Sequence, residues 1–268
     1  MKNLLTLSLA VTLGLGLSSS ANALVIDGKL DDWGLSHQWT PTSNNDGRGQ
    51  YSYNGFTINY TVEDYTRGYD SGQVNPGYGG QAYDAEALYL TWDSANFYVA
   101  LITGHDPGTP DNPSRNTFGP GDFALSFWNG VGTPTYTYGI ETTGNFGQKG
   151  GIYQVSGWSK SPYWGGSYIT SIAAGAKIGT ASLGISATPV TGIGGGPAND
   201  KHWFYEFSAP LSAFSFNPGS KVSVYWTMNC ANDMIEVDPP VGVDEPPVWA
   251  LLGLTLPAVF WRRRRSIR

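Results

Sequence analysis

Two apolar runs, residues 85–92 and 97–103, constrain the fold of this chain most, because each is hydrophobic on both faces of an extended strand. The turn residues 93–96 join the two runs into a predicted hairpin. Such a hairpin belongs inside a sheet that is covered on each side. A long helix is the weaker alternative, since the turn interrupts the pattern and β-branched and aromatic residues dominate. In the first run Leu88, Leu90 and Trp92 share one face and Ala87, Tyr89 and Thr91 the other; in the second run Phe97, Val99 and Leu101 oppose Tyr98, Ala100 and Ile102.

The rest of the body predicts more short strands without long helices between them. Charged residues make up only 13% of the 268 residues, whereas aromatic residues reach 14% and there are 36 glycines. This composition favours short strands joined by polar turns. We therefore predict an all-β fold, an antiparallel β-sandwich over residues 24–240. The expected strands are 51–62 (a strand, or a hairpin turning at Asn54-Gly55), 121–128, 134–141, 152–155, 167–172, 181–188, 202–208 and 221–229, with a helical turn at 211–214.

The N-terminal residues 1–23 have the three parts of a secretory signal peptide. Lys2 precedes the apolar run 4–17, and small residues follow it. Cleavage is expected after Ala23, with Ala21 as the second small residue of the cleavage site. A permanent membrane anchor is the alternative, but the apolar run is short for a membrane span. An exported protein is therefore expected.

Residues 241–268 are expected to be a sorting tail and not part of the sandwich. The short apolar run 248–261 predicts a hydrophobic helix, and four arginines follow it. By the positive-inside rule these arginines would hold the far end in the cytoplasm, so the chain would be anchored transiently in the inner membrane. A permanent tail anchor is the alternative. The basic residues are Arg262, Arg263, Arg264 and Arg265.

The charge balance narrows the classes of partner. Without Lys2 and the five arginines of the tail, 9 basic residues face 21 acidic ones, a net charge of −12. Such a body repels nucleic acid and anionic membranes but tolerates hard cations and neutral sugars. Cys230 is the one cysteine of the sequence and stands in a strand-like context, which favours a buried, inert thiol over a nucleophile.

The tail resembles a PEP-CTERM sorting signal, the bacterial tail that exosortase reads. The resemblance covers about the last 25 residues. It departs from the family pattern at Asp244, Glu245 and Pro246, where Pro-Glu-Pro would be expected. The resemblance implies an exosortase-type processing protease as partner, cleavage near these three residues, and a place at the cell surface or in an extracellular polysaccharide matrix.

The body resembles the DOMON-like sandwich family, which includes the ninth family of carbohydrate-binding modules and has jelly-roll architecture. The resemblance rests on IDGKLDDW at 26–33, LTWDSANFYVAL at 90–101, Gly121-Asp122 and YEFSAPLSAF at 205–214. It covers nearly the whole body. It implies binding of sugars, haem or other small ligands, with structural calcium in some members. For haem, Met228 and His202 are available as axial ligands, but nothing in the sequence pairs them.

Acidic residues in strand-like positions are candidate metal ligands. Glu86 is expected on the face of Leu88 and Leu90, and Asn232 and Asp233 follow the last strand. A carboxylate turned toward a packed layer needs a cation or hydrogen-bond donors. Oxygen ligands without histidine or cysteine clusters suit calcium. The alternative is that these acids, like Glu141 and Glu206, meet backbone N–H groups or water.

Three aromatic residues are candidate ligand-binding groups. Trp158, Tyr163 and Trp164 are expected in one loop rich in Gly, Ser and Pro, where their rings could stack on sugars. They could equally fold back as a small hydrophobic cluster.

Enzyme signatures are missing from the sequence, which contains no HExxH, no GxSxG and no nucleotide-binding loop. We therefore expect an exported surface or matrix protein that binds carbohydrate, an exopolysaccharide of the extracellular matrix, and is not an enzyme. One alternative is a calcium-stabilised structural matrix protein without a dedicated ligand. The other is a glycoside-active enzyme, since paired carboxylates cannot be located from sequence.

Overall fold

The computed structural model describes residues 23–35, 38–66, 72–194, 196–217 and 219–239. The sorting tail and nearly all of the signal peptide lie outside the described residues, as do the predicted hydrophobic helix and the arginine cluster. Short 3-10 turns occur among the strands. They are η1 (Asp31–Trp33), η2 (Gly80–Tyr83), η3 (Pro113–Arg115), η4 (Trp164–Gly166) and η5 (Leu211–Ala213).

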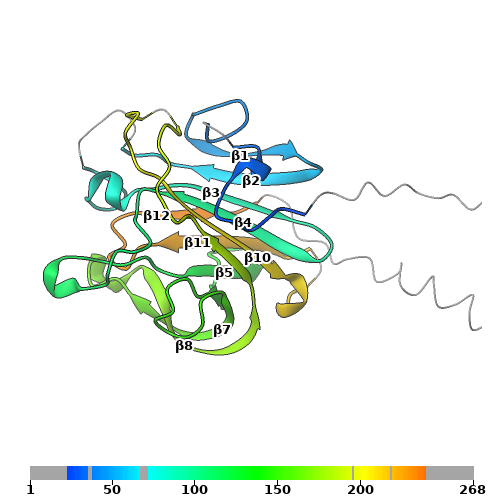
Figure 1. Ribbon diagram of the computed structural model, residues 1–268. Helices are drawn as coiled ribbons and strands as arrows, with labels where there is room; N and C mark the ends of the chain where they lie inside the picture. The colour runs from blue at the N-terminus through cyan, green and yellow to red at the C-terminus, as the bar shows by residue number, and fades with distance from the viewer. Residues whose placement is uncertain (1–22, 36–37, 67–71, 195, 218, 240–268) are drawn as a thin grey trace, which may run out of the picture.

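The described part of the chain forms two antiparallel six-stranded sheets, which confirms the all-β prediction (Figure 1). The first sheet has the order β1-β2-β3-β4-β10-β9 and the second β12-β11-β5-β6-β7-β8. The first contains β1 (Gly47–Tyr53), β2 (Phe56–Val62), β3 (Ala85–Trp92), β4 (Asn96–Thr103), β10 (Trp203–Pro210) and β9 (Ser182–Ile185). The second contains β12 (Met234–Val237), β11 (Lys221–Thr227), β5 (Phe123–Trp128), β6 (Tyr138–Ile140), β7 (Gly151–Lys160) and β8 (Ile169–Thr180).

The predicted central hairpin is confirmed in place and in the side chains of its two faces. β3 pairs with β4, and the two strands sit in the interior of the first sheet between β2 and β10. One face contributes to an inner core shared with the second sheet, as expected for a β-sandwich. The inner core includes Leu88, Leu90, Val99 and Leu101 from the hairpin, Phe207 from β10, and Phe123, Val224 and Trp226 from the second sheet.

The other face of the hairpin is covered by the N-terminal segment, drawn in dark blue in Figure 1. Trp33 and Trp39 are fully buried there against Tyr89, whose hydroxyl donates to the Trp39 carbonyl at 2.7 Å. This outer cluster explains why the hairpin is apolar on both sides. Removing a fully buried tryptophan of this kind typically costs about 3–5 kcal/mol. The cluster consists of Leu24, Leu30, Trp33, Leu35, Trp39, Phe56, Ile58, Val62, Ala87, Tyr89, Tyr98, Ala100, Ile102, Ile193 and Phe204.

A bulge at the start of β3 turns the side chain of Glu86 away from the face on which it was expected. The register with β4 shifts between Ala85 and Ala87, so strict alternation fails there. Ala85 belongs to the inner core although Ala87 belongs to the outer cluster. Glu86 does not share the face of Leu88 and Leu90 as expected, because it reaches His202, which lies beside Trp39 of the outer cluster.

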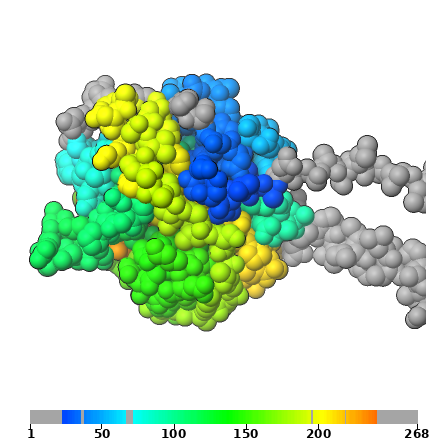
Figure 2. All heavy atoms as spheres, viewed as in Figure 1, coloured from blue at the N-terminus to red at the C-terminus, as the bar shows by residue number. Residues whose placement is uncertain are grey.

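Two strands of the second sheet are longer than predicted, three are shorter, and β12 was not predicted. β7 and β8 form a long hairpin that extends through residues expected to be loop, and its register shifts several times between Ile152 and Lys160. β6 covers only Tyr138–Ile140, and β5 and β11 are each two residues shorter than predicted. The segment around η3 projects from the body of the molecule, as Figure 2 shows in green.

Candidate functional site

Three buried acids meet at one end of the first sheet. Asp64 follows β2, Asp84 precedes β3, and Glu86 lies in β3; their exposed fractions are 7%, 0% and 0%. One carboxylate oxygen from each lies within 4.8 Å of the others. Antiparallel pairing of Val62 with Ala87 brings the end of β2 to the start of β3, and so brings these acids together. We call Asp64, Asp84 and Glu86 the acid triad.

Asp233 joins the acid triad from the second sheet. It stands directly before β12, and its Oδ2 accepts a hydrogen bond from the Ala85 N–H at 2.7 Å. Its Oδ1 accepts from the backbone N–H groups of Asn75 and Met234. Burial, and then the charge of Asp84, raise the pKa of Asp233 well above its usual value. The pKa of Asp84 is also raised by burial.

Asp84 is only partly satisfied by hydrogen bonds. Its Oδ2 accepts from the Thr66 N–H at 2.9 Å, but no hydrogen bond from an N–H or hydroxyl group of the described residues reaches its Oδ1. The charge of Asp84 is the strongest electrostatic influence on Asp233 after burial, so the two carboxyls lie close together. The site therefore needs either protons or a cation to hold its carboxylates together.

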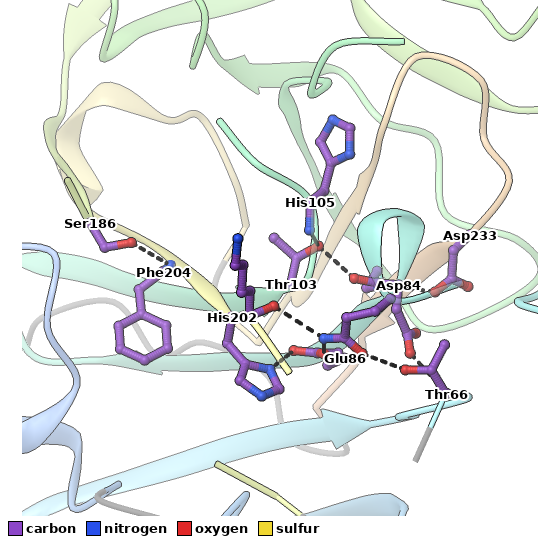
Figure 3. A network of polar contacts seen from close by, with 12 residues as sticks. Thr66, Asp84, Glu86, Thr103, His105, Ser186, His202, Phe204 and Asp233 are labelled. Atoms are coloured by element: carbon purple, nitrogen blue, oxygen red, sulfur yellow. Dashed lines mark hydrogen bonds and ion pairs between the residues drawn. The ribbon is translucent and has the colours of Figure 1, made fainter. Parts of the chain in front are cut away.

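Glu86 connects the acid triad to His202. Its Oε2 lies 2.7 Å from His202 Nδ1, and its Oε1 accepts from Gln81 Nε2 (Figure 3). Burial lowers the pKa of His202, and His202 Nδ1 and Glu86 Oε2 share one hydrogen bond. His202 Nε2 has no hydrogen-bond partner among the described residues. Burial, followed by the charges of Asp84 and Asp64, raises the pKa of Glu86.

The predicted metal ligands fall into this region, but unequally. In Figure 3, Glu86 lies toward His202, and Asp233 lies toward the opposite end of the network beside Asp84. Asn232 is engaged elsewhere, because its side-chain amide donates to the Tyr78 carbonyl. Sequence reasoning missed Asp64 and Asp84. Each stands beside the end of a predicted strand, and that position was the available signal.

The predicted aromatic group is divided by the fold. Trp158 lies in β7 and not in a loop, where its Nε1 donates to the Tyr136 carbonyl at 2.9 Å and its ring packs close to Gly139. Tyr163 and Trp164 do lie in the turn between β7 and β8 and are 42% and 39% exposed. The correction to Trp158 follows from the length of β7, and it leaves two exposed rings in the turn.

An open groove of about 440 Å³ runs beside this turn, on the second sheet. Its walls come from the segment around η3, the loop after β6 and the β7–β8 hairpin. Tyr163 stands next to the groove and packs edge-on against the Phe118 ring at 5.6 Å. The lining mixes hydrogen-bonding and aromatic side chains: Asp111, Phe118, Asp122, Asn145, Phe146, Ser159, Lys160, Ser171 and Asn229 among others.

The acids at the groove are satisfied by the protein itself. Asp122 accepts hydrogen bonds from the Thr142 and Ile172 N–H groups, both at 2.8 Å. Burial nevertheless raises the pKa of Asp122 to about 6. Nearby Glu141 accepts from the N–H groups of Gly144 and Asn145 and from the Thr143 hydroxyl. These two carboxylates position the loop after β6 along the groove.

A second pocket, of about 430 Å³, lies close to the acid triad. It is lined by Gln81, Tyr83, His105, Asp106, Asp200 and Trp203, among others. Gln81 is the link, since it lines the pocket and donates to Glu86. Cys230 is fully buried, and burial raises the pKa of its thiol to about 11, in keeping with an inert thiol.

No protein-family model and no curated protein matches this chain. Within the described residues, no helix is long and apolar enough to cross a membrane.

Proposed function

We propose that this protein is an exported β-sandwich that binds an extracellular polysaccharide through the groove beside the β7–β8 turn. The observation that carries the proposal is the groove itself, which places aromatic rings next to amide, hydroxyl and charged side chains. Sugar rings present an apolar face and a rim of hydroxyls, so a site with both kinds of group suits them. The strongly acidic body fits a neutral glycan.

The proposal also includes the cellular setting that the sequence suggests. The resemblance to DOMON-like and family-nine carbohydrate-binding modules supports sugar binding. The resemblance of residues 241–268 to a PEP-CTERM tail supports export, transient anchoring in the inner membrane and processing by an exosortase-type protease. Intact-mass measurement of surface material tests the processing, and recovery of a chain that still ends in Arg262–Arg265 would argue against it.

Glycan binding is tested with the purified full chain on an array of neutral and acidic glycans. Alanine variants of Phe146, Asn145 and Tyr163 remove an aromatic wall, a polar wall and the neighbouring ring of the groove. Each substitution is expected to weaken binding by about 1–3 kcal/mol, roughly 5- to 150-fold. Tyr78→Ala is the matched control, because Tyr78 is 67% exposed and does not line the groove. Binding that survives all three substitutions would remove the groove as the site.

The second candidate function is a structural matrix protein that a cation stabilises, and the acid triad favours it. The two candidates separate experimentally, because a purely structural protein would bind no glycan on the array whatever its cation content. A glycoside-active enzyme is a weaker candidate. The acids Asp84, Glu86 and Asp233 are 0% exposed, whereas a glycosidase needs both carboxyls in contact with substrate.

A further inference from the structure

The acid triad has the dimensions of a site for one hard cation. Calcium binds oxygen ligands at 2.3–2.6 Å, so two ligand oxygens of one ion lie at most about 5 Å apart. One oxygen each from Asp64, Asp84 and Glu86 satisfies this limit, since all three lie within 4.8 Å of one another. Three carboxylates from neighbouring strand ends thus already converge on one point.

The second observation is the unsatisfied oxygen of Asp84. Asp84 is fully buried, yet Oδ1 receives no N–H or hydroxyl donor from the described residues. The strongest charges acting on Glu86 and on Asp233 are those of Asp84, which places its carboxylate among the other acids. A buried carboxylate oxygen without a donor costs free energy unless a cation or a proton meets it.

No basic side chain is among the principal influences on Asp84, Glu86 or Asp233. His202 touches Glu86, but its desolvation favours the neutral imidazole. Histidine in this position orients a carboxylate as an outer-shell partner does at a metal site. Besides burial, the strongest electrostatic influences on Glu86 and Asp233 are therefore other carboxylates, whose mutual repulsion a bound cation would relieve.

We propose that Asp64, Asp84 and Glu86 bind a hard divalent cation, for which calcium is the best match, with Asp233 holding the site closed from the second sheet. Carboxylate oxygens without a cysteine ligand select calcium over softer metals. The 430 Å³ pocket lies next to this site, because Gln81 both lines the pocket and donates to Glu86.

The cation ties together parts of the fold that come from distant segments. Asp64 follows β2 and Asp84 precedes β3, whereas Asp233 precedes β12 and accepts a hydrogen bond from the Ala85 N–H, 148 residues away in sequence. Asp233 thereby joins the second sheet to the end of the first sheet at which the ion would bind. Since the ion binds only the folded chain, it stabilises that chain in proportion to its occupancy.

The test measures the melting temperature and calcium content of the purified full chain after chelator treatment. At a calcium concentration about 100 times the Kd, the melting temperature is expected to rise by roughly 5–10 °C. Metal analysis after dialysis against calcium should give one ion per chain. Asp84→Asn and Glu86→Gln, which keep the shape of the side chains, should each weaken calcium binding at least tenfold.

Glu206→Gln is the matched control, because Glu206 is also fully buried but lies on β10, hydrogen-bonded to the N–H groups of Asp27 and Gly28. This variant should keep the calcium response of the wild type. If protons instead hold the acids together, calcium will leave the wild-type melting temperature unchanged and metal analysis will find none, which overturns the proposal. These readouts need only the wild type, so they decide even where a variant fails to fold, and they are independent of glycan binding.

Discussion

The groove and one end of the first sheet both bury acids at strand ends, but they stabilise them in different ways. At the groove, Glu141 and Asp122 accept hydrogen bonds from neighbouring backbone N–H groups. At the end of the first sheet, Asp84 and Glu86 face other carboxylates, and Asp84 Oδ1 has no N–H or hydroxyl donor within the described residues. Burial alone therefore does not indicate a cation site. The supply of donors separates a structural acid from a metal ligand.

The difference follows from the local backbone. The residues after Glu141 turn back over its carboxylate, and Gly144, with a φ of +87°, allows this tight turn. The chain supplies its own donors there. The acid triad instead collects acids from the ends of paired strands, where most N–H groups are already used in the ladder. Few backbone N–H groups are therefore left to donate hydrogen bonds to the carboxylates that converge there.

The largest effect is expected at the groove, with Glu141→Ala. This change leaves the N–H groups of Gly144 and Asn145 and the Thr143 hydroxyl without their acceptor, and it should lower the free energy of unfolding by about 3 kcal/mol. Urea denaturation measures it. The loss should be equal with chelator and with calcium, since these donors have no role at the acid triad. If calcium restored the lost stability, the carboxylate of Glu141 would depend on a cation as the acid triad does.

A smaller effect of opposite sign is expected at the acid triad, with Asp84→Asn in chelator at pH 8. Removing one of the converging carboxylates relieves repulsion and desolvation, so the free energy of unfolding should rise by about 1–2 kcal/mol. When calcium is added, the same variant should have a lower free energy of unfolding than the wild type. Urea denaturation in both buffers checks this crossover. Destabilisation in chelator would show that Asp84 is a structural acid like Glu141.

The sequence predicts the sandwich and its central hairpin because alternation is a local property. The apolar residues of 85–103 carry enough information to assign both of their faces. Trp158 was misplaced because Gly157 and its serine neighbours have loop composition, whereas the bulged pairing of β7 with β8 accommodates them. The direction of Glu86 was missed for a related reason, since the bulge at Ala85 leaves no mark on the pattern.

The acid triad could be predicted only in part. Glu86 and Asp233 stand out as acids next to apolar strands, but the central residue is Asp84, which the sequence does not distinguish from a turn aspartate. Asp84 is central because β2, β3 and β12 meet beside it. Asp233, which accepts a hydrogen bond from the Ala85 N–H, lies 148 residues further along the sequence. Long-range pairing is a property of topology, and no local pattern reports it.

Glu206 is intermediate between Glu141, which accepts several hydrogen bonds, and Asp84, which has one oxygen without a donor within the described part of the chain. Its Oε2 accepts from the N–H groups of Asp27 and Gly28, both at 3.1 Å, while its Oε1 has no partner among the described residues. Burial, and then the charge of Asp32, raise its pKa to about 8, despite the two donors.

This raised pKa fixes the sign of a pH effect. Between pH 5 and 8 the folded chain keeps a proton on Glu206 that the unfolded chain releases, so stability present at low pH is lost as the pH rises toward 8. Glu206→Gln removes this titration but keeps the shape and one acceptor. Relative to wild type, the variant should therefore gain unfolding free energy as the pH rises from 5 to 9. Urea denaturation in chelator across this range measures the gain, and the other acids cancel in the difference between the two proteins. Parallel pH profiles for the two proteins would mean that two backbone donors suffice for a buried carboxylate, and the boundary between structural acid and cation ligand would then lie closer to Asp84.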